Sequence, residues 1–346
     1  MKGVVQMVFE LGSVSLKKAI IHVLDSISDY PILSSVELDF EDEQIFQFIS
    51  KHLEKILVSE ELKPGILGEN STISPIFEAV FEDQSNFYEA SRDIAFELFK
   101  IIKENPGIPA GDLLVCLFEM EGQEYMSLVK FNYKSSYVHE VQPAKNGDYI
   151  TTLRRQDNIL PNTKQRPEEG VVIHLAHKEV GILEKKYEIN GTKDFYLSEI
   201  LLKSENKLST KEKMTLLQNI NENFVKTYHD QDVEEKAVLK KAAYEVVLEE
   251  GVLDVEKTIE KAFPEEGELK EIYKENLSRA GLMSTQIPLK EQTFSRVLSK
   301  QKIKTDTGVE ITIPIEYYKD KDKLEFIANE DGTISILIKN VGKIDA

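Results

Sequence analysis

The spacing of hydrophobic residues changes near residue 107, and this change limits the fold more than any other feature of the 346-residue sequence. From Glu41 to Val58 apolar residues recur every three or four positions, and they do so again from about Tyr88 to Glu104, which predicts two helices. Leu113 to Glu119 and Tyr125 to Tyr133 are instead strand-like runs, and the short Glu121-Gly122-Gln123 connection predicts a hairpin between them. Helices and hairpins that are segregated in this way are typical of α+β proteins.

The rest of the chain extends this pattern. The apolar run Ala19 to Leu24 is interpreted as part of a helix, and a second helical block is expected from about Asp194 to Arg279. Three strands are expected at the end of the chain, over 309–317, 323–328 and 333–339, with an Asp-Gly turn between the last two. We therefore predict antiparallel hairpins and two lobes, an N-terminal domain over residues 1–200 and a C-terminal domain over 201–346.

The segment from Gln142 to Gly170 differs from its surroundings. It is polar, and it contains Pro143, Gly147, Pro161, Pro167 and Gly170. These residues interrupt regular structure, so we predict a loop-rich segment with room for an edge strand near Tyr149 to Leu153.

Charge and cysteine content exclude several classes of protein. The 43 Lys and Arg residues face 61 Asp and Glu residues, so the formal net charge is −18. Such a surface argues against a protein coated in positive charge, the usual footprint of a nucleic-acid binder. One cysteine, Cys116, cannot form an internal disulfide, which is typical of a reducing compartment. No stretch approaches the roughly 18 apolar residues of a membrane span.

Motifs that carry catalytic chemistry are not evident. The sequence has no Gly-rich phosphate loop, no dinucleotide fingerprint and no Gly-x-Ser-x-Gly elbow. Cys116 lies in an apolar run and His22 among apolar residues, and we interpret both as buried structural groups.

Two short polar motifs leave the alternative of a metal-binding site open. His174 and His177 have a metal-ligand spacing, but in a continuous strand the two rings would point to opposite faces. Glu184-Lys185-Lys186 resembles the Glu-x-Lys end of metal-dependent nuclease motifs, although charged residues are so common here that a solvated face is the simpler interpretation.

Basic residues gather in two places despite the acidic total. Between Lys130 and Arg166 seven basic residues face three acidic ones, with aromatic residues between them, and between Lys290 and Lys304 five face one. Such islands could pair with a phosphate backbone and release its counterions, or they could merely solubilise loops or pair with the surplus acidic residues. The candidates for DNA contact are Lys145, Arg154, Arg155, Lys164, Arg166, Lys290, Arg296, Lys300, Lys302 and Lys304.

Several segments, taken in order, resemble one family. They are Ala19 to Leu24, Phe46 to Leu57, Asp112 to Val115 before the 125–133 strand, Phe195 to Leu201, Thr312 to Pro314, and Asp331 to Ile336. Together they are similar to the bacterial nucleoid-associated proteins of the NdpA/YejK type, over nearly the whole chain.

The resemblance implies a cytoplasmic bacterial protein that localises with the nucleoid and associates with DNA or DNA-bound machinery, and it supplies no catalytic residues. We expect no metal and no cofactor. The acidic charge keeps a second hypothesis open, in which the acidic block from Glu234 to Glu275 docks on a basic partner such as a DNA-remodelling enzyme. A metal-dependent nuclease with carboxylates near Glu184 is a third. Whether two copies form a homodimer stays open, and exposed hairpins offer edges for pairing.

Overall fold

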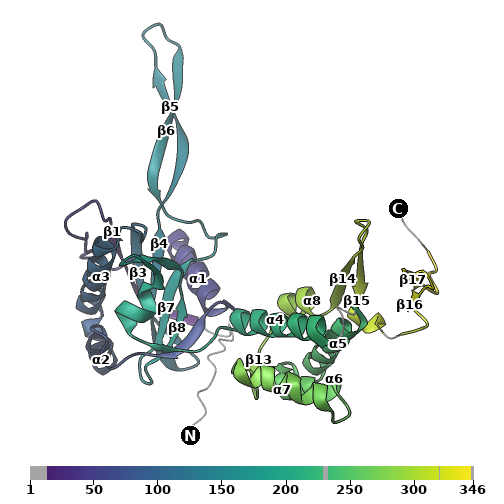
Figure 1. Ribbon diagram of the computed structural model, residues 1–346. Coiled ribbons are helices and arrows are strands. Elements are labelled where there is room, and N and C mark those ends of the chain that lie inside the picture. Colours follow the sequence, from purple (N-terminus) through teal and green to yellow (C-terminus); the bar gives the residue numbers. More distant parts are fainter. Residues whose placement is uncertain (1–13, 229–232, 319, 344–346) are drawn as a thin grey trace. The chain divides into compact units, whose positions relative to one another are not determined.

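The computed structural model describes residues 14–228, 233–318 and 320–343, and it confirms an α+β protein (Figure 1). The chain divides into two compact units between Ser209 and Thr210, called unit 1 and unit 2 below. The α-helices are α1 (Glu43–Leu57), α2 (Ser74–Glu82), α3 (Phe87–Glu104), α4 (Thr210–Tyr228), α5 (Val233–Glu250), α6 (Val255–Ala262), α7 (Glu268–Arg279) and α8 (Glu291–Val297).

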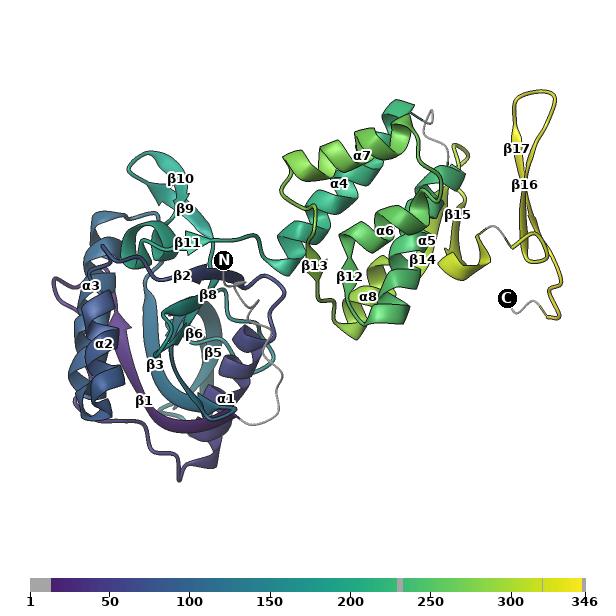
Figure 2. The same cartoon turned by 90° about the horizontal axis from the view of Figure 1, so that it is seen from below.

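Unit 1 is built on a seven-stranded antiparallel sheet with helices on both faces (Figure 2). One face packs on α1 and the other on α2 and α3, because neighbouring residues of a strand point to opposite sides. In the centre of the sheet, Cys116 and Phe118 join the α1 cluster, whereas Val115 and Leu117 join the α3 cluster. The strands, in their order across the sheet, are β1 (Val14–Leu24), β3 (Gly111–Met120), β4 (Gln123–Asn132), β7 (Glu169–His174), β8 (Glu179–Leu183), β2 (Lys63–Ile66) and β11 (Glu205–Asn206).

The predicted helices at 41–58 and 88–104 are confirmed as α1 and α3. Asp42 begins α1, since its carboxylate accepts hydrogen bonds from the backbone N–H groups of Gln44 and Ile45. The hairpin is also confirmed as β3 and β4, with Met120 opposite Gln123. Glu121 and Gly122 between them both have positive φ, 50° and 73°, as a two-residue type I′ turn requires.

The helical interpretation of Ala19 to Leu24 is wrong, because these residues belong to β1. They pair with β3 from Ala19 opposite Cys116 to Leu24 opposite Gly111. The run is apolar on both sides because helices cover both faces of the sheet, and a short continuous apolar run does not distinguish a buried strand from a helix. The β-branched residues Ile20, Ile21 and Val23 favour the strand.

The segment expected to be loop-rich contains part of a long β-hairpin, whose second strand confirms the edge strand expected near Tyr149 to Leu153. The hairpin consists of β5 (Lys134–Pro143) and β6 (Tyr149–Ile159), which pair with each other and project from the end of the sheet in unit 1 (Figure 1). We call residues 134–159 the arm. Most of its residues are exposed, so it lacks the core-facing apolar run by which a strand is usually recognised.

A smaller hairpin and a π-helix complete unit 1. Strands β9 (Lys186–Ile189) and β10 (Thr192–Phe195) form the hairpin, and the π-helix η2 covers Leu197–Leu202. The second helical block therefore begins with α4 at Thr210, later than the sequence pattern indicated.

Unit 2 combines α4 to α8 with three two-stranded sheets. Leu217 of α4, Val247 of α5 and Tyr273 of α7 meet in its main apolar cluster. The three strands expected at the end of the chain are confirmed as β15, β16 and β17, while β14 was not anticipated. The sheets are β12 (Leu253–Asp254) with β13 (Gln286–Ile287), β14 (Lys300–Lys304) with β15 (Glu310–Pro314), and β16 (Leu324–Ala328) with β17 (Ile334–Ile338).

Candidate nucleic-acid interface

Three lysines share the exposed face of strand β14. Lys300, Lys302 and Lys304 are exposed, whereas Gln301 and Ile303 between them are buried. This alternation follows from the two-residue period of a strand, because Ile303 packs in an apolar cluster on the inner face. Successive lysines are therefore about 6.6 Å apart along the strand. We call Lys300, Lys302 and Lys304 the lysine face.

One carboxylate on the neighbouring strand lies within this face. Glu310 of β15 is opposite Lys304, and its oxygens lie 2.6 Å from Nζ of Lys302 and 3.9 Å from Nζ of Lys304. The side chains of Lys302 and Lys304 remain 61% and 69% exposed, so water screens both ion pairs. Pro314 is opposite Lys300 and carries no charge. The lysine face thus keeps a net positive charge.

Further basic residues flank the lysine face. Arg296 is exposed in the last turn of α8, the helix that leads into β14, and Lys290 is the N-cap residue at the other end of that helix. From α5, Lys240 Nζ donates to the carbonyl of Lys300 at 2.5 Å, and Lys241 Nζ donates to the carbonyl of Tyr318 at 2.9 Å. Sequence reasoning missed these two lysines because they lie some 60 residues before the basic island. In the sequence, only their position as two consecutive lysines marks them.

The arm places its basic residues differently. Paired residues of an antiparallel ribbon share a face, so Tyr137 with Arg155 and His139 with Leu153 lie on one side. Arg154 lies opposite Val138 on the other side. Arg154 and Arg155 therefore cannot both face one flat surface, although they are neighbours in sequence. Arg155 also forms an ion pair with Asp157 at 2.9 Å, with both side chains 59% exposed.

The remaining arm-side candidates are dispersed. Lys145 is exposed in the turn between β5 and β6, while Lys164 and Arg166 are exposed in the segment that returns from the arm to β7. That segment is attached to α1, because Nζ of Lys55 donates to the carbonyls of Thr163 and Gln165. The structure thus brings together Lys300, Lys302 and Lys304, with Arg296 in the last turn of the helix that leads into their strand, but not the basic residues on and after the arm.

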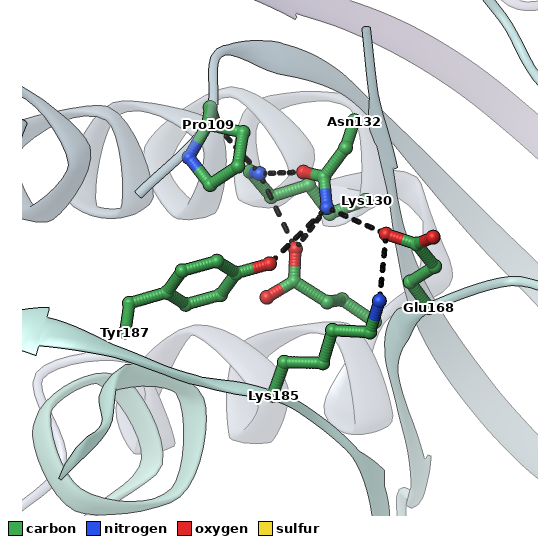
Figure 3. Close-up of polar contacts among 7 residues, drawn as sticks. Pro109, Lys130, Asn132, Glu168, Lys185 and Tyr187 are labelled. Atoms are coloured by element: carbon green, nitrogen blue, oxygen red, sulfur yellow. Dashed lines mark hydrogen bonds and ion pairs between the residues drawn. The ribbon is translucent and has the colours of Figure 1, made fainter. Parts of the chain in front are cut away.

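A buried polar network holds the root of the arm (Figure 3). Nζ of Lys130, at the end of β4, lies 3.3 Å from Oε2 of Glu169 at the start of β7, and both side chains are almost fully buried. Nδ2 of Asn132 donates to the same Oε2 at 2.9 Å, and the Pro109 carbonyl accepts from Lys130 at 2.8 Å. Burial lowers the pKa of Lys130, and the charge of Glu169 opposes that shift. Strands β4 and β7 are thereby joined where the arm leaves the sheet.

The interpretation of Cys116 and His22 as structural groups is confirmed. Cys116 is fully buried, and burial raises the pKa of its thiol to about 12. His22 is also fully buried, with Nε2 3.1 Å from the Ser91 hydroxyl and Nδ1 accepting from the Ser34 N–H at 3.0 Å. Burial, together with the nearby Arg92 charge, lowers the pKa of His22 to about 4.

The expected divergence of His174 and His177 is wrong. Strand β7 ends at His174, and the chain turns so that the two ring centroids lie 4.5 Å apart. Nδ1 of His174 accepts hydrogen bonds from the N–H groups of Ala176 and His177, which occupies it within the turn. Among the described residues, no group of three or more His, Cys, Asp or Glu side chains is placed to bind a metal ion.

Glu184 is part of the structure beneath the π-helix. Its side chain is buried, Oε2 accepts from the Ser198 N–H at 3.0 Å, and Oε1 lies 3.5 Å from Nζ of Lys63. Its two neighbours diverge, because Lys185 pairs with Glu168 at 3.1 Å and Lys186 lies over the Phe195 ring. The triplet therefore does not present one cluster of groups to a phosphate.

No helix in the described parts of the chain has the length and apolar character needed to cross a bilayer. A comparison with curated proteins found no match. The family model of the nucleoid-associated protein YejK, however, matches residues 20–344. This match spans both units, from β1 to beyond β17, and it confirms the resemblance inferred from the ordered segments. The chain belongs to the family of the nucleoid-associated protein YejK.

Proposed function

We propose that this nucleoid-associated protein contacts DNA directly and without catalysis, and that the lysine face of β14 binds the phosphate backbone. The observation that supports this proposal is the alternation along β14, which puts Lys300, Lys302 and Lys304 on one exposed face. Lysine is a point charge with three donors, and it suits phosphate oxygens without selecting a base. Binding of this kind is electrostatic and independent of sequence.

The supporting structure suits a fixed phosphate contact. Ile303 anchors the inner side of β14, and the Lys240 bond to the Lys300 carbonyl ties the strand to α5. The exposed side chains therefore extend from a backbone whose position is fixed, which reduces the ordering that DNA binding would require. Arg296 adds a fourth exposed cation at the end of α8.

The acidic total is compatible with a contact of this size. Charges beyond about 8 Å in physiological salt are largely screened, so an exposed phosphate responds mainly to the charges nearest to it. The remaining acidic surface would repel DNA and so restrict the approach to the lysine face.

A fluorescence-anisotropy titration of the full chain with a labelled DNA duplex, at salt concentrations from 50 to 200 mM, tests the proposal. We expect the logarithm of affinity to fall linearly with the logarithm of salt concentration. Absence of binding at the lowest salt concentration would contradict a direct contact.

A second candidate function is recruitment through a basic partner on the chromosome. The observation in its favour is the block from Glu234 to Glu275, in which thirteen acidic residues face seven lysines. Many of these charges are already paired within the block, for example Lys261 with Glu249 at 2.6 Å and Lys270 with Glu260 at 2.7 Å. Association with the nucleoid that survives nuclease treatment would favour this candidate, whereas its loss would favour direct contact with DNA.

A further inference from the structure

We propose that two copies of this chain associate through the arm, each arm packing its apolar face on the end of the sheet in unit 1 of the other copy. The apolar face consists of Tyr137, Val141, Tyr149 and Leu153, and it packs on the segment 25–36, which we call the end loop.

The apolar face of the arm is exposed, and His139, Thr151 and Arg155 share this side of the ribbon with its four apolar residues. Residue pairing places Tyr137, Val141, Tyr149 and Leu153 on one side of the ribbon, and they are 66%, 51%, 75% and 70% exposed. An isolated two-stranded hairpin is at best marginally stable in water, and three or more strands or a packing partner are needed. A surface that covers this face would supply the missing apolar contact.

The end loop is a second exposed apolar surface on the same unit. Ile27, Tyr30, Ile32 and Val36 are 91%, 76%, 64% and 70% exposed. Exposed apolar residues that lie close together mark interaction surfaces, whereas single ones are ordinary.

The backbone of the end loop is fixed despite this exposure. Nζ of Lys103 donates to the carbonyls of Ser26 and Ser28 at 3.1 and 2.9 Å, and Arg92 donates to that of Ser34 at 3.2 Å. Ile32 also forms a β-bridge with Val23. Because the loop is already ordered, a partner would bind it with little loss of backbone entropy.

The arm and the end loop leave the same end of the sheet. Leu24 of β1 is opposite Gly111 of β3, which is opposite Asn132 of β4. The end loop begins one residue after Leu24, and the arm begins two residues after Asn132. The arm extends away from this end of its own unit (Figure 1). A two-fold axis just beyond the sheet end would let each arm reach the end loop of the other copy reciprocally.

The size of the arm suits this arrangement. Its strands of 10 and 11 residues are about 35 Å long at roughly 3.3 Å per residue, which is comparable to the width of a small domain. Half of the 26 arm residues and the 12 residues of the end loop give about 25 residues from each copy, which matches the roughly 20 to 30 residues that each partner contributes to a standard interface.

Charge favours a second copy over DNA as the occupant. The end loop contains two acidic residues and no Lys or Arg, and Lys103 pairs with Asp29 at 3.7 Å, whereas the arm has four basic residues and three acidic ones. The small charges of the two surfaces are therefore of opposite sign, which favours an arm over a phosphate backbone as the occupant. Both complementary surfaces belong to one sequence, so the chain carries everything that the contact requires.

Sedimentation velocity of the full chain tests the proposal. We expect the wild-type protein to sediment at twice its 39.5 kDa, and Leu153→Asp to raise the dissociation constant at least about 100-fold, because it buries a charge among apolar groups. Ile150→Asp is the matched control, since Ile150 is 56% exposed on the opposite face of the same ribbon. A monomeric wild-type protein at 100 μM, or equal dissociation by both variants, would overturn the proposal.

Cysteine cross-linking identifies the contact itself. Because Cys116 is buried, single cysteines introduced at Tyr30 and Leu153 can be oxidised without background. We expect a mixture of Tyr30→Cys and Leu153→Cys proteins to form a disulfide-linked heterodimer. If Leu153→Cys cross-links only to itself, the arms pair with each other and not with the end loop, and the proposal is wrong.

Discussion

Neutralising the lysine face should remove most of the salt dependence of DNA binding. If Lys300, Lys302, Lys304 and Arg296 each neutralise one phosphate, the slope of log affinity against log salt concentration is about −3.6. Replacing the three lysines with glutamine leaves one such contact and a slope of about −0.9.

These slopes give effects that are readily distinguished. Between 50 and 200 mM salt the wild-type protein should lose about 150-fold in affinity and the triple variant about 3-fold. Fluorescence anisotropy with one labelled duplex measures both proteins under identical conditions. An unchanged slope in the triple variant would refute the assignment of phosphate contacts to β14.

A matched variant separates local contact from total charge. Lys257, Lys261 and Lys274 are ion-paired lysines on α6 and α7 of the same unit, so replacing them with glutamine lowers the net charge by the same amount. The resulting loss of surface ion pairs costs little stability. We expect this variant to keep the wild-type slope. If instead Arg154→Gln/Arg155→Gln removes most of the salt dependence of binding, the arm and not the lysine face contacts the phosphates.

The other predictions concern single groups. Glu310→Gln should tighten DNA binding by a few-fold in the same titration, because it removes the carboxylate between two of the phosphate-binding lysines. Glu169→Gln should lower the free energy of unfolding, measured in urea, by about 3 to 5 kcal/mol, because it leaves the Lys130 charge buried and unpaired. The double variant Lys130→Met/Glu169→Gln should lose less, since it leaves no unpaired buried charge. An equal loss in the two variants would count against the ion pair. The pKa of His22 is lower in the folded state than its unfolded value of 6.5, so the contribution of His22 to the free energy of unfolding is present above pH 6.5 and is lost as the pH falls. At pH 5 the free energy of unfolding should be about 2 kcal/mol lower for this reason. His22→Asn should remove this part of the pH dependence in urea melts. Cys116 should stay unlabelled by a thiol reagent in the native protein and react fully in denaturant, whereas rapid native labelling would show that β3 opens.

The elements that were predicted correctly are those whose pattern is decided by one packed face. Helices α1 and α3 each pack one side on the sheet, so their apolar residues keep helical spacing. Strand β1 was assigned to a helix because it is buried on both faces, which removes the alternation that identifies a strand.

The arm was predicted only in part, as an edge strand near Tyr149 to Leu153, because its residues are exposed along most of its length. The alternation of Tyr137, His139 and Val141 and the Asn146-Gly147 turn were the available signals. For the candidate interface, the sequence located both basic islands but not the side of the strand on which each basic residue lies. Lys300, Lys302 and Lys304 lie on one face because they are alternate residues of a strand. Arg154 and Arg155 lie on opposite faces because they are consecutive residues of a strand.

The position of the arm in the topology has a consequence for engineering the protein. Strands β4 and β7 are antiparallel neighbours, with Lys130 opposite Glu169, so the whole excursion from residue 133 to 168 starts and ends at adjacent points. A short turn could join the two strands directly, as Glu121 and Gly122 already join β3 to β4. The arm is thus an insertion in the meander β3-β4-β7-β8, whereas the segment after it is attached to α1 through Lys55 and packs through Leu160. A chain shortened at the arm alone would keep the sheet while lacking whatever the arm provides.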